Sequence, residues 1–341
     1  MSSPIRGWGL VPGLLPPGAR NLITDVPGVT VGHWTLQNAR HNTGLTVIVP
    51  RPGLYDDPCT AACCVINGYG KTCGLVQVEE LGRLETPIAL TNTLNVGLVA
   101  DALVQYTLDT ASAPVRSVNP VVGECNDATL NTIAERVMGY DQLQAALAAA
   151  GPDFAQGCVG AGAGMICHEL KGGIGSASRL VEGYTVGVLA LCNYGQLAEL
   201  NILGRRPGAA IRARLNEPPR PADKGSCMLI LATDLPLSSR QLKRVVRRCA
   251  VGLARCGSYW GHGSGDIAIG FTTAAHWPRR ADGLTMTETV FNEDKLDAAF
   301  AAAAEAAEES VLNALAAAVP TTGPDGRVCR ALCEFKEEVF P

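Results

Sequence analysis

The chain has 341 residues, of which 47% are hydrophobic and 18% are charged, and its formal net charge is −4. This length suits one large domain with a sizeable core, and the apolar content excludes a disordered chain. The small negative charge gives no electrostatic reason to expect a nucleic-acid partner. No run approaches about 18 consecutive apolar residues, so we expect no membrane span.

The thirteen cysteines and five histidines show no metal-ligand or disulfide pattern. The number of cysteines is odd, no C-x-x-C occurs, and the histidines form no H-E-x-x-H motif. We therefore expect reduced core cysteines, no bound metal and no cofactor. The first residues lack the charged-then-apolar layout of a signal peptide, which predicts a cytoplasmic protein.

Along the chain, the β-branched segments 29–33 and 46–50 predict a hairpin of two strands. Residues 66–70, with the sequence Ile-Asn-Gly-Tyr-Gly, predict a tight turn. Residues 87–93 predict a strand that leads into a helix over 96–108.

The end of that strand supplies a predicted helix cap. Asn92 or Thr93 precedes the helix and is of the residue type that caps helix N-termini. A turn of this kind can also line a pocket.

An apolar strand over 120–123 ends in the polar residues Glu124 and Asp127, and a helix is predicted over 130–138. Polar side chains directly after a strand are frequently functional, because a rigid scaffold presents them on a loop. Helix capping by Asp127 is the structural alternative.

Residues 157–179 are dense in glycine but match no nucleotide-binding motif. No G-x-G-x-x-G opens a helix, and no G-x-x-x-x-G-K-[ST] is present. We interpret this stretch as close backbone packing around a site. The following segment, 184–192, predicts a buried strand that ends at Asn193, whose amide is a suitable fixed donor for an oxyanion or simply a turn residue.

The proline-rich residues 203–224 predict an exposed loop, and the pair Gly225-Ser226 then opens a continuous apolar strand. Most Gly-Ser pairs are turns. This pair also meets the requirements of a self-cleaving nucleophile, because glycine adopts strained backbone geometry at low cost and a freed α-amine could activate the serine hydroxyl.

Residues 238–256 predict an amphipathic helix capped by Ser238 and closed by Gly257. The basic cluster on it is interpreted as a solvated helix face (Lys243, Arg244, Arg247 and Arg248). Ser264 and Asp266, two residues apart at a strand start, face the same way and could polarise a nucleophile, or form a capping turn. An alanine-rich helix is predicted over 293–318.

Several of these motifs, in this order, resemble the L-aminopeptidase/D-Ala-esterase/amidase family, the self-processing β-aminopeptidases of the DmpA/BapA type. The resemblance spans roughly residues 20–335. It rests on segments that include Asn21 to Val29, Lys171 to Gly175, Gly225-Ser226, Ala232 to Leu237 and Ser264 to Ile267.

The resemblance implies an α/β fold, a four-layer αββα sandwich similar to N-terminal nucleophile hydrolases but with different connectivity. It implies one catalytic domain, 1–341, that cleaves itself into fragments 1–225 and 226–341, which stay associated. Such αβ units are expected to form a homo-oligomer, with no nucleic-acid or membrane partner. Small peptides, amides and esters of L-, D-Ala- or β-amino acids are the expected substrates.

The resemblance also assigns roles to individual residues. Ser226 is the nucleophile, Asn193 stabilises the oxyanion, and Glu124 anchors the substrate ammonium. Ser264 and Asp266 assist proton transfer. Some family members carry a tyrosine where this chain has Asn126, so that tyrosine's role is replaced or lost.

Two alternatives share the implied architecture. One is an acyltransferase of the ornithine acetyltransferase type, whose members use a threonine nucleophile where this chain has Ser226. The other is an uncleaved, non-enzymatic binding protein of the same fold.

Overall fold

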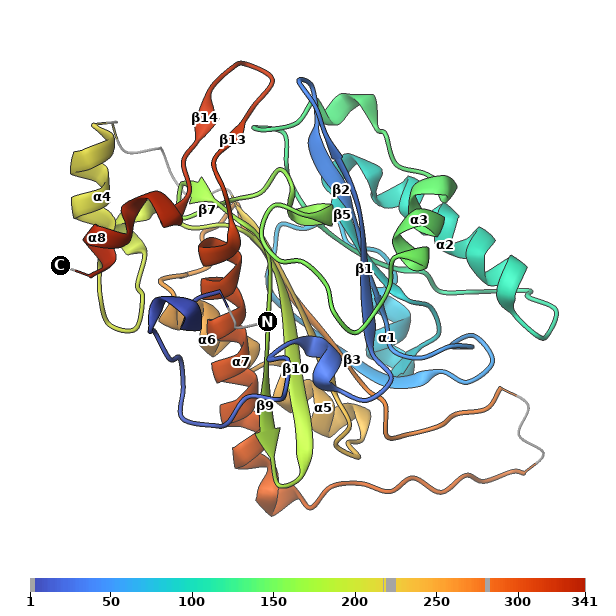
Figure 1. Cartoon of the computed structure of the whole chain (residues 1–341). Helices are drawn as coiled ribbons and strands as arrows, with labels where there is room; N and C mark the ends of the chain where they lie inside the picture. Colours follow the sequence, from blue (N-terminus) through green and yellow to red (C-terminus); the bar gives the residue numbers. More distant parts are fainter. Residues whose placement is uncertain (1–3, 217, 219–224, 280–282, 341) are drawn as a thin grey trace.

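The computed structural model describes residues 4–216, 218, 225–279 and 283–340. In these residues two β-sheets lie face to face, and helices cover the outer face of each sheet (Figure 1). The expected four-layer αββα sandwich is confirmed. The two inner layers place a row of strand ends at one end of the sandwich, and these strand ends form the site described below.

The first sheet has the strand order β1-β2-β5-β6, in which β1 and β2 form an antiparallel hairpin and β5 pairs with β6 in parallel. Apolar side chains such as Val47 and Leu45 pack against two helices on its outer face. The elements of this half are β1 (Thr30–Gln37), β2 (Asn42–Val49), β5 (Ile88–Asn92), β6 (Val121–Cys125), α2 (Val96–Thr110) and α3 (Tyr140–Ala148).

The second sheet has six strands in the order β4-β3-β12-β11-β10-β9. All neighbouring pairs are antiparallel except β11 and β12, which run parallel. Three helices cover its outer face. The elements of this half are β3 (Cys59–Gly68), β4 (Arg83–Leu84), β9 (Gly173–Val181), β10 (Tyr184–Asn193), β11 (Ser226–Thr233), β12 (Gly265–Thr272), α5 (Ser239–Val246), α6 (Cys249–Arg255) and α7 (Leu296–Ala317).

Strand β11 shows how the sequence builds the layers. Met228 and Ile230 point into the core between the sheets, whereas Leu229 and Leu231 point into the core beneath the helices. Because this strand is buried on both faces, it reads as a continuous apolar run and not as an alternating pattern. The predicted strand from residue 226 is therefore confirmed.

Short elements connect the layers. Helix α4 precedes the segment that leads to Ser226, and α1 packs on β3. The short helices and strands are α1 (Leu75–Leu81), α4 (Gly208–Leu215), α8 (Lys336–Val339), β7 (Ile166–Cys167), β8 (Leu170–Lys171), β13 (Thr321–Thr322) and β14 (Val328–Cys329).

Several local predictions are wrong. The turn expected at 66–70 is largely the end of β3, which continues to Gly68 because it pairs with β12. The helix expected over 130–138 is only a short 3-10 turn at Ile133–Glu135. The loop expected over 203–224 contains helix α4, and its residues 217 and 219–224 lie outside the described part of the chain.

The helix predicted over 238–256 is present as two helices, α5 and α6, which are separated at Arg247 and Arg248. Ser238 caps the first helix as predicted, since its hydroxyl accepts a bond from the backbone N of Gln241 at 3.3 Å. The cap predicted at Asn92 or Thr93 is wrong, because neither side chain bonds to the start of α2.

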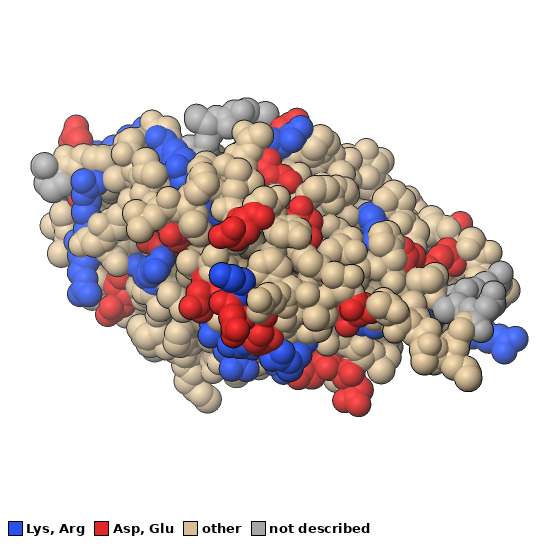
Figure 2. Space-filling view, turned by 90° about the horizontal axis from the view of Figure 1, so that it is seen from below, with Lys and Arg blue, Asp and Glu red and all other residues tan. Residues whose placement is uncertain are grey.

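Charges on the surface are mixed in sign. Figure 2 shows one face of the molecule on which acidic and basic groups alternate. Lys243 is paired with Glu79, and Arg244 with Glu293, so part of the basic cluster on α5 is matched by carboxylates. Within the described part of the chain, no helix has both the length and the apolarity to cross a bilayer.

Candidate active site

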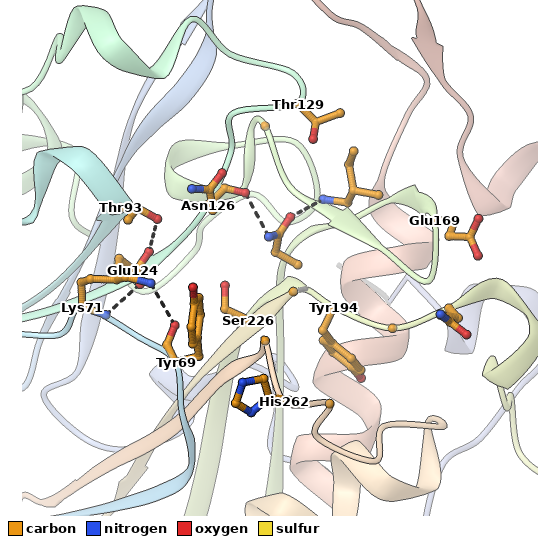
Figure 3. A pocket seen from close by; sticks show the side chains of 18 of the residues that line it. Tyr69, Lys71, Thr93, Glu124, Asn126, Thr129, Glu169, Tyr194, Ser226 and His262 are labelled. Atoms are coloured by element: carbon orange, nitrogen blue, oxygen red, sulfur yellow. Dashed lines mark hydrogen bonds between the residues drawn. The ribbon is translucent and has the colours of Figure 1, made fainter. Parts of the chain in front are cut away.

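A pocket of about 910 Å³ opens at the end of the sandwich where β5, β6, β3 and β10 finish and where β11 and β12 begin (Figure 3). Strand ends from both sheets thus contribute to one cavity. Its lining includes Tyr69, Lys71, Thr93, Glu124, Asn126, Glu169, Asn193, Tyr194, Gly225, Ser226, Tyr259 and His262.

Ser226 and Asn193 lie directly opposite each other in the antiparallel ladder of β10 and β11. Asn193 is held from two sides. Its Oδ1 accepts a bond from the backbone N of Ile166 at 2.9 Å, and its Nδ2 donates to the carbonyl of Asn126 at 3.0 Å. A side-chain amide has two N–H donors, so one remains to serve a group bound at Ser226.

The backbone at Asn193 and Tyr194 packs closely against Gly225. A Cβ at this position would overlap the carbonyl oxygen of Asn193 and the Cα of Tyr194. Close packing is therefore one reason for glycine here, because it has no Cβ. The backbone N of Gly265 donates to the Gly225 carbonyl at 3.2 Å.

Glu124 is buried at the end of β6, and both of its carboxylate oxygens are oriented by neighbours. Oε1 accepts a bond from the backbone N of Lys71 at 2.9 Å, and Oε2 accepts one from the hydroxyl of Thr93. Figure 3 shows these residues together on one side of Ser226. A fixed carboxylate beside a serine can hold a cationic group of a bound molecule.

Ser264 and Asp266 flank Gly265, and Gly265 is the register partner of Ser226 in the parallel ladder of β11 and β12. The structure thus brings this pair next to the strand position of Ser226. Both side chains are buried, and neither lines the pocket. The hydroxyl of Ser264 has no hydrogen-bond partner in the described part of the chain.

The sequence did not single out Cys125, which touches the site. Its thiol donates to the Leu191 carbonyl at 3.6 Å, and burial raises the thiol pKa well above its ordinary value, so the group stays neutral. Only the packing of the two sheets brings β6 and β11 together here. The strand-end position of Cys125, one residue after Glu124, was the available signal.

The glycine-dense stretch does pack closely, and it surrounds a buried lysine. The Lys171 ammonium donates to the carbonyls of Gly162, Met165 and Gly172 at 2.8–3.0 Å. Burial lowers the pKa of this lysine. These bonds fix the loop that carries Ile166, which in turn holds Asn193.

Within the described residues, no group of three or more His, Cys, Asp or Glu side chains is arranged to hold a metal ion. All thirteen cysteines are free thiols.

Comparison with known proteins gives a family match over most of the chain. Residues 21–329 match peptidase family S58. The β-peptidyl aminopeptidase BapA of Sphingosinicella microcystinivorans is 37% identical over 93% of this chain and 86% of its own length.

Solved structures agree with the family match. A Burkholderia β-aminopeptidase superposes with a TM-score of 0.92 at 40% identity and covers 100% of this chain and 98% of its own. The L-aminopeptidase D-Ala-esterase/amidase of Ochrobactrum anthropi gives 0.89 at 31% identity, with 99% and 97% covered. The latter is described as a prototype for the serine aminopeptidases and as a variant of the Ntn hydrolase fold.

Proposed function

Because the chain belongs to peptidase family S58, we propose that it cleaves itself at Gly225-Ser226 and then uses Ser226 to release amino-terminal residues from small peptides, amides and esters. The chain is a hydrolase of the aminopeptidase/amidase type, and the acyltransferase and binding-protein alternatives are not favoured. The proposed substrates include those with an amino-terminal β-amino acid, as in the β-aminopeptidases it is similar to.

The observation that carries this proposal is the position of Ser226. It begins a buried central strand at the base of the pocket, opposite Asn193 and after a glycine that no other residue could replace without displacing its neighbours. A serine at this point can become a chain terminus that faces a cavity. Few positions in a fold combine these properties.

Self-cleavage would proceed by an N-to-O acyl shift. The Ser226 hydroxyl attacks the Gly225 carbonyl carbon, the C–N bond breaks, and the nitrogen becomes the α-amine of Ser226. Water then hydrolyses the ester and leaves a carboxylate on Gly225. The Gly265 N–H, which already donates to the Gly225 carbonyl, would support the negative charge that develops on that oxygen.

In turnover, the freed α-amine of Ser226 would act as the base, since its ordinary pKa of about 7.7–8.0 suits neutral pH. Asn193 and backbone N–H groups would hold the oxyanion of the tetrahedral intermediate. Ser264 and Asp266, next to Ser226 in the sheet, would assist proton transfer. Glu124 would bind the substrate ammonium.

The two fragments would stay together because they share one sheet. In the order β4-β3-β12-β11-β10-β9, the central strands β12 and β11 come from fragment 226–341, and the strands on both sides come from fragment 1–225. Cleavage at the start of β11 removes none of these ladders. Assembly of such αβ units into a homo-oligomer, and a cytoplasmic location, stay as predictions that sedimentation and cell fractionation would test.

The need for a free amine tests the role of Glu124. We expect the wild-type protein to hydrolyse β-alanyl p-nitroanilide and to leave its N-acetylated form intact, because a desolvated carboxylate selects a cation over a neutral amide. Glu124→Gln keeps the shape of the side chain but removes its charge, so KM for the free-amine substrate should rise. Equal hydrolysis of both anilides by the wild type would show that Glu124 does not bind the substrate ammonium.

A further inference from the structure

The Glu124 end of the pocket also carries a positive charge, on Lys71. The backbone N of Lys71 holds Glu124, and its side chain folds back so that Nζ donates to the Tyr69 carbonyl at 3.1 Å. The ammonium lies 4.2 Å from the centre of the Tyr69 ring. Lys71 and Glu124 both line the pocket, and Figure 3 labels them on the same side of Ser226. Groups of opposite charge therefore lie at one end of the pocket.

Within the described residues, no carboxylate forms an ion pair with the Lys71 ammonium, and the acceptor of its Nζ is the neutral carbonyl of Tyr69. The other lysine that packs on a ring, Lys336, lies on α8 away from this cavity. Glu169, which also lines the pocket, is paired with Arg212 at 2.7 Å. An ammonium has three donors, so Lys71 keeps donors for a ligand.

We propose that Lys71 binds a carboxylate on the amino-terminal residue of the substrate, so that the enzyme favours residues that carry an ammonium and a free carboxylate together. The inference rests on the proposed function, because it takes Glu124 as the ammonium site. A lone substrate ammonium beside Glu124 is repelled by the Lys71 charge. A substrate carboxylate removes this repulsion and adds a charge-assisted hydrogen bond.

The adjacency of Lys71 and Glu124 favours one linkage over another. In an aspartyl residue linked through its β-carboxyl group, the ammonium and the free carboxylate are on the same carbon, and one methylene separates that carbon from the scissile carbonyl. Both charges can then face the Lys71–Glu124 end while the carbonyl reaches Ser226. In an α-linked aspartyl residue, the carbon that carries the ammonium also carries the scissile carbonyl. The free carboxylate is attached to the next carbon, at the end of the side chain.

The test compares three p-nitroanilides, those of β-linked aspartate, α-linked aspartate and β-alanine. β-Alanine has the same backbone as the β-linked aspartyl residue without its carboxylate. We expect the wild type to give its highest kcat/KM with the β-linked aspartyl substrate. In Lys71→Met the ratio of kcat/KM for β-aspartyl to β-alanyl substrate should fall about tenfold, the effect of one charge-assisted hydrogen bond. Lys71→Glu should lower it further.

Lys336→Met is the matched control, because that ammonium also packs over a ring, 4.7 Å from the centre of Trp8, but does not line the pocket. It should leave the ratio unchanged. Turnover of the β-alanyl substrate with the same ratio in wild type and Lys71→Met would overturn the inference and spare the proposed function. If the wild type prefers the α-linked aspartyl substrate and Lys71→Met abolishes this preference, the carboxylate site is supported. The inferred preference for the β-linkage is then overturned. Turnover of no anilide would overturn the proposed function and this inference with it.

Discussion

The six-stranded sheet carries two groups of buried polar side chains, and they differ in how completely they are paired. At one group, Arg179 on β9 donates to Glu305 at 3.0 Å and to Glu309 at 2.7 Å, and also to the backbone carbonyls of Ser178 and Pro12. Arg6 adds a second cation to Glu309 at 2.7 Å. This charge network joins the amino-terminal segment, β9 and α7.

The second group lies at the opening of the sandwich, and its pairing is incomplete. The hydroxyls of Ser264 and Tyr194 are buried without a partner in the described part of the chain. The nearby thiol of Cys125 is neutral and donates to the Leu191 carbonyl at 3.6 Å. Buried polar groups are normally satisfied, so incomplete pairing in a cavity indicates chemistry, whereas the completed Arg179 network indicates a structural role.

The protonation of Glu309 fits this distinction. Burial alone would raise its pKa, but the hydrogen bond from Arg6 and the charges of Arg179 and Arg6 outweigh burial and lower it below the ordinary value. The folded-state pKa is thus below that of the unfolded chain. The stabilisation is therefore present above the ordinary pKa of a glutamate and is lost as the pH falls through the folded-state value.

The largest effect is expected from Ser226→Ala, which removes the nucleophile from the incompletely paired group. Turnover of β-alanyl p-nitroanilide should fall by roughly 10⁶-fold, the loss seen when a serine nucleophile is removed. The chain should still fold, because Ser226 makes no structural ion pair. Ser226→Cys keeps a nucleophile at this position and is the control. Residual activity within tenfold of the wild type would place the nucleophile elsewhere.

Arg179→Met tests the completed network. It leaves the carboxylates of Glu305 and Glu309 buried without their shared cation, so the free energy of unfolding should fall by about 3–5 kcal/mol. Urea denaturation measures this loss, and kcat per folded molecule should stay within twofold. If Arg179→Met matched the wild type in stability but lost activity, the assignment of the two groups would be reversed.

Asn193→Ala should lower activity more than stability, the opposite of the pattern expected for Arg179→Met. The loss of one oxyanion donor lowers kcat by about 10²–10³-fold, with a smaller change in KM, since the donor acts on the transition state. Steady-state kinetics and urea denaturation of the same sample separate this effect from unfolding. A kcat within twofold of wild type would exclude Asn193 from the mechanism.

The apolar runs and alternating patterns predicted the principal strands because they report burial directly, whereas the four layers were implied by the resemblance to the family. The wrong predictions arose where tertiary contacts override local chemistry. Asn92 donates to Thr43 and Asp127, and Thr93 donates to Glu124, so neither is free to cap α2. Strand β3 continues to Gly68 because β12 pairs with Asn67 and Gly68.

At the site, local motifs identified Ser226, Asn193 and Glu124 as candidates, and the fold places all three around one pocket. The sequence could not identify Cys125 or the Gly265 N–H, because their proximity to Gly225 and Ser226 depends on strand register and on the stacking of the two sheets. That the Lys71 ammonium has no carboxylate partner among the described residues likewise depends on what surrounds its side chain.

The most direct test of the account is the intact mass of the purified protein, with sequencing of the new amino terminus. Division of the 35.6 kDa chain by length after Gly225 predicts two fragments of about 23 and 12 kDa that copurify. The smaller fragment should begin at Ser226, and Ser226→Ala should give one uncut chain. A wild-type chain that keeps its full mass after prolonged incubation, yet hydrolyses β-alanyl p-nitroanilide, would contradict the account.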